Sequence, residues 1–151
     1  MTTRPFTTFN FRISLQLEGE NAPLCQGEFA ECDGLEMTIE PKTIREGGNN
    51  GRQIHLVGPV SYGQLTLKRG MTASFGLWTW FERIQQERSL RASGEIVILG
   101  SDRTSEDVRF VVSGCLPIKV KAPALNAKDG QIAVEELQIA YETLHLAAPG
   151  S

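Results

Sequence analysis

The sequence predicts a mainly β fold with one α-helix, and three observations carry that prediction. Residues 9–17, FNFRISLQL, alternate apolar and polar side chains, which is typical of a strand with one buried face. A glycine- and asparagine-rich segment at residues 46–52 separates two further extended runs. Residues 74–90 carry apolar side chains at helical spacing.

The composition is that of a single globular domain covering residues 1–151. Of these residues, 40% are apolar and 22% charged, and the net charge of −3 excludes a basic field over the whole surface that would attract nucleic acid. The longest apolar runs are far shorter than the ~20 residues of a membrane helix. The N-terminus, MTTRPFTTFNF, lacks the apolar core of a signal peptide. We therefore expect cytoplasmic synthesis and no membrane insertion of the subunit.

Two further extended segments follow the first strand. After a turn at residues 18–23, residues 24–32 give a weaker strand signal that ends at the turn dipeptide Asp33-Gly34. Apolar and polar residues then alternate strictly over residues 35–40. We expect the apolar residues of this alternation to pack inward.

Proline and glycine punctuate the middle of the chain. Pro41 interrupts the alternation, and because proline donates no ladder hydrogen bond it predicts an edge position or a bulge. Residues 46–52, EGGNNGR, contain a run of successive glycines and asparagines suited to positive φ and predict a mobile loop. Residues 53–60 are weakly extended, and residues 62–68 predict another strand with its leucines facing inward.

The expected helix covers about residues 75–88, and Ser74 suits its N-cap position. Trp78 lies off the apolar stripe of this helix, on the side that also carries polar residues. A tryptophan there either contacts a partner or packs beneath a neighbouring loop, and the sequence supports both interpretations equally. The stripe itself consists of Leu77, Trp80, Phe81 and Ile84.

The C-terminal half predicts strands, with one ambiguous segment. Residues 95–99 and 108–112 predict a hairpin, and residues 116–122 a short extended segment. The apolar residues of the segment 132–146 fit both a helical period and strand alternation, and periodicity alone does not decide between them.

No catalytic, cofactor-binding or metal-binding site is predicted. Cys25, Cys32 and Cys115 form no CxxC pair, and His55 and His145 lie in no cluster with ligand spacing. We interpret the cysteines as buried, reduced thiols and the histidines as ordinary polar or cross-strand residues. The chain is therefore not expected to be an enzyme.

Seven phrases of the sequence, in order, resemble those of one protein family. They are Phe9–Phe11, Gly27–Leu35, Ile44–Asn50, Leu65–Gly70, Leu77–Trp80, Leu116–Lys119 and Val134–Leu137. Together they resemble the tail-tube, or inner-tube, proteins of contractile phage tails and phage-tail-like injection systems. The sequence departs from the family pattern at Ile44, where tyrosine is common, and at Cys32-Asp33, where small residues are usual.

This resemblance implies a β-barrel-like sandwich with one helix that forms hexameric rings. The rings would stack end to end into a hollow conduit for DNA or effectors, with hairpins joining neighbouring subunits into a continuous lumen barrel. It also implies that residues 132–146 form a strand, with a bulge at Glu135-Glu136. The implied partners are further copies of the chain, a contractile sheath protein, baseplate or hub and tail-terminator proteins, and the lumen cargo.

The resemblance also indicates which residues act in assembly. The loop expected to reach an adjacent subunit or ring consists of Arg45, Glu46, Gly47, Gly48, Asn49, Asn50, Gly51 and Arg52. The polar residues expected to face the lumen are Glu36, Thr38, Glu40, Gln64, Thr66 and Lys68. Trp78 is the candidate partner contact on the helix.

Three alternatives stay open at the level of the sequence. The chain is either a main tube subunit or the ring that initiates the tube at the baseplate hub of the same machine. A secreted ring protein of the type six secretion system shares this architecture. From a different class, a small-ligand β-barrel or β-sandwich enzyme predicts a deep apolar pocket in a monomer. We expect assembly in the cytoplasm into a phage tail, a tailocin or an injection particle.

Overall fold

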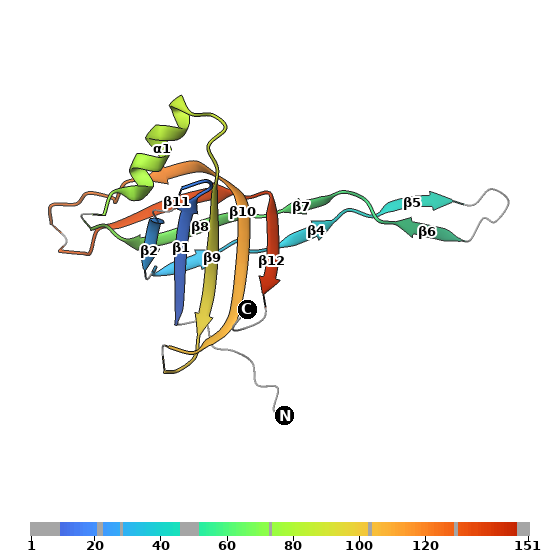
Figure 1. The fold of residues 1–151 in the computed structure, drawn as a ribbon, viewed down its shortest axis with the longest axis horizontal. Coiled ribbons are helices and arrows are strands. Elements are labelled where there is room, and N and C mark those ends of the chain that lie inside the picture. The colour runs from blue at the N-terminus through green and yellow to red at the C-terminus, as the bar shows by residue number, and fades with distance from the viewer. Residues whose placement is uncertain are drawn as a thin grey trace.

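The structure is a computed structural model of the chain. It describes residues 10–20, 23–27, 29–45, 52–72, 74–102, 104–128 and 130–147. The elements in this part of the chain are β1 (Phe11–Leu17), β2 (Pro23–Gly27), β3 (Glu31–Asp33), β4 (Met37–Ile39), β5 (Lys42–Arg45), β6 (Gln53–Leu56), β7 (Val60–Tyr62), β8 (Gln64–Gly70), α1 (Gly76–Gln86), β9 (Ala92–Leu99), β10 (Glu106–Lys121), β11 (Val134–Ala140) and β12 (Thr143–Ala147). The predicted mainly β fold with one helix is confirmed for these residues (Figure 1).

The strand β10 links two layers of antiparallel sheet. Its first half pairs with β9 and β12, and its second half, residues 116–121, pairs with β11. The first layer therefore contains β2, β1, β9, β12 and the first half of β10. The second layer contains the second half of β10, β11, β8 and β3. Between the two halves, Gly114 has a positive φ of 64° and lies at a register shift, which lets the long strand bend (Figure 1).

The hydrophobic core lies between these two layers. The first layer contributes the inward face of β1, and the second layer contributes the inward faces of β8 and β11. The helix α1 adds two buried side chains to this core. The fully or almost fully buried residues include Ile13, Leu15, Leu65, Leu67, Leu77, Trp80, Leu137 and Ile139. The alternation of the first predicted strand is confirmed because its even-numbered residues lie on the opposite, more exposed face.

The predicted weak strand at residues 24–32 is wrong as a single element. It consists of two strands, β2 and β3, that belong to different layers. β2 pairs with β1 in the first layer, and β3 pairs with β8 in the second. The chain crosses from one layer to the other between them, so one extended segment serves two sheets.

The helix lies within its predicted range, but its predicted cap is wrong. The N-cap position is held by Phe75, without a side-chain capping hydrogen bond. The backbone carbonyl of Ser74 instead accepts a hydrogen bond of 3.0 Å from Arg69 Nη2. This contact ties Ser74 to β8, and the helix begins two residues later, at Gly76.

The C-terminal segment is extended, as the family resemblance implies, but it forms two strands, β11 and β12, and the implied bulge is wrong. The pairing of β11 with β8 runs without a shift from Val134 to Ala140. The irregularity lies on the other neighbour, between Pro117 and Lys119 of β10. Glu135 keeps the inward position that alternation gives it, and its side chain is buried.

Gly34 provides a direct stability prediction. Its φ is +105°, and a Cβ at this position would lie 1.9 Å from the carbonyl oxygen of Gln64. We expect Gly34→Ala to lower the free energy of unfolding by about 2 kcal/mol or more, because it adds both backbone strain and a clash. The exposed Gly130 has no atom within 4 Å of such a Cβ, so Gly130→Ala should change stability by less than about 0.5 kcal/mol. Chemical denaturation of the two variants, read by circular dichroism, checks both values.

Candidate assembly site

A two-stranded ribbon projects from the second layer and forms the most distinctive surface of the molecule. We call this ribbon, made of β4, β5, β6 and β7, the arm (Figure 1). It prolongs β3 and β8, the strands that precede and follow it in the chain. Within the described residues, β4 pairs only with β7 and β5 only with β6. No other described strand therefore supports the arm.

The two strands of the arm place apolar side chains opposite one another. Met37 lies opposite Tyr62, and Ile39 lies opposite Val60. In the outer section, Ile44 lies opposite Ile54. Since directly paired residues share a face, each section of the arm has one mainly apolar face and one polar face. The polar pairs are Thr38 with Ser61 and Thr43 with His55.

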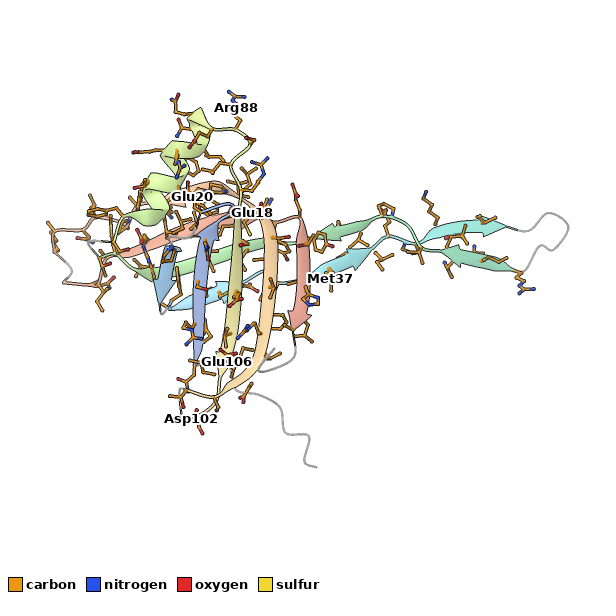
Figure 2. The ribbon with its side chains drawn as sticks, in the orientation of Figure 1. Glu18, Glu20, Met37, Arg88, Asp102 and Glu106 are labelled. Carbon is orange, nitrogen blue, oxygen red and sulfur yellow. The ribbon has the colours of Figure 1, made fainter. Side chains whose placement is uncertain are left out.

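The apolar side of the arm is exposed to solvent. Val57, in the segment between β6 and β7, is exposed, and so are five large apolar residues of the four strands: Met37, Ile39, Ile44, Leu56 and Val60. Met37, at the base of the arm (Figure 2), is 59% exposed and Ile39 is 52% exposed. The expectation that Met37 and Ile39 pack inward is therefore wrong within one copy of the chain, whereas Leu35, at the base of the arm, is half-buried against the core. A two-stranded ribbon of this composition is at best marginally stable in water, and contiguous exposed apolar side chains mark an interaction surface.

Tyr141 fixes the base of the arm to the sandwich. Its hydroxyl donates a hydrogen bond of 2.7 Å to the carbonyl of Gly34 and accepts one of 3.0 Å from the backbone N–H of Glu36. Its ring lies 5.6 Å from that of Tyr62 on the other strand. Burial raises the pKa of Tyr141. The phenol therefore stays a neutral hydrogen-bonding anchor, and this role was not predicted from the sequence.

The predicted lumen residues divide between the sandwich and the arm. Gln64, Thr66 and Lys68 lie on the polar face of β8, opposite the buried leucines of the same strand. Thr38 and Glu40 lie on or beside β4 in the arm and are exposed, whereas Glu36 is half-buried at its base. The six residues thus lie along one continuous hairpin, and do not converge on a pocket.

Only the ends of the predicted contact loop are described. Arg45 ends β5, and Arg52 comes just before β6. Glu46, Gly47, Gly48, Asn49, Asn50 and Gly51 lie outside the described residues. The role of this loop stays a prediction.

Trp78 has a partner within the chain. Its side chain is half-buried, and its indole N–H donates a hydrogen bond of 2.8 Å to Glu135. The same carboxylate lies 2.6 Å from Nε of Arg69, and both charged residues are buried. The Arg69 guanidinium also lies over the ring of Phe29, 5.3 Å from its centroid. This cluster joins β8, β11 and α1, and its buried charges were missed from the sequence.

The described residues hold no arrangement typical of catalysis or metal binding. No group of three or more potential metal ligands occurs among them. Burial raises the pKa of the thiols of Cys32 and Cys115 to about 12, so neither is an activated nucleophile. No described helix has the length and apolar character required to cross a membrane.

The described surface has two hollows that bear on the ligand-binding alternative. One, of about 730 Å³, lies beside the segment between β10 and β11, and its lining includes Lys68, Lys121 and Glu136. The other, of about 280 Å³, lies between the two layers and is lined mainly by apolar side chains, among them Phe11, Leu35 and Phe110. Neither combines a deep apolar cavity with convergent polar groups, so the structure does not favour the ligand-binding alternative.

The sequence profile of the T4-like virus tail tube protein gp19 family matches residues 7–145 of the chain. The chain belongs to this family. This match covers the arm, the sandwich and the helix, and it confirms the resemblance deduced from the seven phrases. No curated protein sequence matches this tail tube protein.

Solved structures show that the fold of this tail tube protein occurs in contractile injection systems. A chain in the cryo-EM structure of the anti-feeding prophage baseplate is 24% identical, with a TM-score of 0.83, over 97% of this chain and 98% of that one. A chain in the sheath–tube complex of an extracellular contractile injection system, PVC, is 20% identical, with a TM-score of 0.80, over 95% and 92%. Hcp1 from Flavobacterium johnsoniae is 13% identical, with a TM-score of 0.51, over 91% and 95%.

Proposed function

We propose that this tail tube protein forms hexameric rings that stack into the inner tube of a contractile tail or injection system. The observation that carries the proposal is the exposed apolar side of the arm, in a chain whose family is that of tail tubes. A second copy that covers the apolar faces of the arm would remove large apolar side chains, among them Met37, Ile39 and Val60, from water. Burial of each stabilises the assembly by up to about 1.5–3 kcal/mol.

The polar faces of the hairpin give the tube its inner wall. With the apolar side of the arm against a neighbour, the side that carries Thr38 and Ser61 stays hydrated. In the sandwich, the polar face of β8, which carries Gln64, Thr66 and Lys68, supplies the hydrated surface. A hydrated wall suits a passive conduit through which cargo, DNA or an effector, passes without being held. The subunit then acts through its shape and rigidity, and not as an enzyme.

The similar structures support the choice of partners. They include chains in structures described as a baseplate, a sheath–tube complex and a tube-terminating cap. We propose that this protein contacts a sheath protein along the tube, a baseplate or hub at one end and a terminator at the other. Assembly takes place in the cytoplasm, and contraction of the sheath drives the rigid tube through a target envelope.

The loop at the tip of the arm should be required for polymerisation and dispensable for folding. We expect the double replacement Gly47→Val and Gly48→Val to abolish stacked tubes, because β-branched side chains do not accept the positive φ that this segment suits. The far-ultraviolet circular dichroism spectrum and the melting temperature should stay those of the unaltered protein. Tubes of normal length from the variant would contradict this role.

Sedimentation velocity over a range of protein concentrations tests the proposed oligomer. The proposal predicts a discrete species of about 100 kDa, six chains of 16.6 kDa, in equilibrium with larger stacks. A single species with the mass of one chain at every concentration, up to the highest that stays in solution, would contradict it.

A further inference from the structure

The second layer ends in two strand edges that no other strand of the described residues pairs with. β3 pairs with β8 on one side, and no described strand lies on its other side. Residues 116–121 of β10 pair with β11, and no described strand pairs with their opposite edge. Ile118, Lys119 and Lys121 on this second edge are all exposed. Such edges offer free backbone hydrogen-bonding groups to another chain.

The strand directions allow these two edges to pair with each other in successive copies. The four strands of the layer, in the order β10, β11, β8 and β3, are antiparallel at every step. The first and last strands therefore run in opposite directions. Repetition of the layer by rotation about one axis then places β3 of one copy antiparallel to β10 of the next, which continues the existing pattern.

The charges on the polar face alternate across the layer. The cross-strand register aligns Lys121 with Glu136, Glu136 with Lys68, and Lys68 with Glu31. The neighbouring row runs from Lys119 through two uncharged residues to Asp33. Each row begins with a lysine at the β10 edge and ends with a carboxylate at the β3 edge.

These edge lysines and carboxylates make few ion pairs within the described part of the chain. In the described part of the protein, Lys119 and Lys121 have no carboxylate within 4.0 Å. Glu31 makes one ion pair, 3.7 Å from Lys68, and its side chain is 56% exposed. Asp33 accepts a hydrogen bond from the backbone N–H of Gly34 and is exposed.

We infer that the carboxylates of the β3 edge and the lysines of the β10 edge select each other between neighbouring copies. This inference rests on the proposed ring and specifies how the ring closes. In head-to-tail pairing, Glu31 and Asp33 meet lysines at every interface, so the alternation of charge continues around the ring. Pairing of two β3 edges, or of two β10 edges, would place like charges opposite each other. The charges thus favour a closed ring over a two-fold dimer.

Variants that reverse the charge of one edge, measured separately and as a mixture, test the inference. The variant Lys119→Glu/Lys121→Glu has two acidic edges, and the variant Glu31→Lys/Asp33→Lys has two basic edges. We expect each variant alone to need about tenfold or more protein than the unaltered chain to form rings, because every interface opposes like charges. A mixture in equal amounts should restore ring formation, since alternating copies again place opposite charges at each interface.

A matched control and a folding measurement separate this effect from misfolding. Arg88→Glu/Lys128→Glu changes the net charge as Lys119→Glu/Lys121→Glu does, but at two exposed positions outside both strands. It should form rings at the same concentration as the unaltered protein. Circular dichroism melts check that all variants fold. Normal rings from either edge variant, or a mixture that behaves like its separate components, would overturn the inference. Absence of rings from the unaltered chain would instead contradict the proposed function.

Discussion

Glu135→Gln lowers the free energy of unfolding by about 3–5 kcal/mol, the expected cost when one partner of a buried ion pair is removed. Glu135 is 2% exposed and lies 2.6 Å from Arg69, which is 8% exposed. Glutamine has nearly the same size, so the substitution creates no cavity and leaves the Arg69 charge without its carboxylate. The same carboxylate accepts the indole N–H of Trp78, so the attachment of α1 should weaken as well. Urea denaturation followed by tryptophan fluorescence measures the effect.

The adjacent residue provides the control for this prediction. Glu136 lies on the polar face of the same strand, so Glu136→Gln should change stability by less than about 0.5 kcal/mol. The paired replacement Arg69→Met/Glu135→Leu removes both charges together and should recover much of the lost stability. Equal effects of the substitutions at 135 and 136 would contradict the assignment of a buried ion pair.

Ile39→Asp/Val60→Asp abolishes ring formation while the sandwich stays folded. The two residues lie opposite each other on the apolar side of the arm, and both are exposed in the single chain. Charges at these positions have little effect on the isolated subunit, where they stay hydrated. In the assembly they would be buried at an interface without partners, which is strongly unfavourable. Size-exclusion chromatography with light scattering should then find only the mass of one chain, with an unchanged melting temperature.

The polar side of the same strands supplies the matched control. Thr38→Asp/Ser61→Asp introduces the same charges one residue away, on the side proposed to face the hydrated lumen. We expect this variant to form rings. If the substitutions on the polar side block assembly and those on the apolar side do not, the proposed orientation of the arm is inverted.

Local sequence pattern was sufficient for most strands because alternation is a local signal. The run that contains Ile13 and Leu15 was predicted as a half-buried strand, and both residues are fully buried. The same alternation led us to expect that Met37 and Ile39 are buried in the same chain, but both residues are exposed. The pattern shows that one face of a strand is apolar. Whether the same chain or another copy covers that face depends on the tertiary arrangement.

The buried charges were missed for a related reason. Arg69 shares the inward parity of Leu65 and Leu67, and Glu135 shares that of Leu137 and Ile139. Hydrophobic patterning treats such charges as interruptions, so once the family resemblance indicated a strand, it also implied a bulge at Glu135-Glu136. The two residues are paired only because β8 and β11 are neighbours in the sheet, a long-range relation that a single sequence does not contain. A charge at an inward position on each of two strands was the signal that could have identified them.

Several elements of the candidate site also depend on long-range pairing. The hydroxyl of Tyr141 contacts the base of the arm across more than a hundred residues. The unpaired edges at β3 and β10 became visible only once the order of strands was known. The seven phrases of the family nevertheless gave the correct family, because their order along the chain is itself a specific signal.

Cryo-electron microscopy of the purified protein at high concentration tests the central claim most directly. The account predicts end-on views of sixfold rings with a central hole, stacked into tubes, and a reconstruction in which Thr66 and Lys68 line the hole. The apolar side of each arm should lie against a neighbouring copy in that reconstruction. Isolated single subunits at every concentration, or rings whose holes are lined by the apolar side of the arm, would contradict the account.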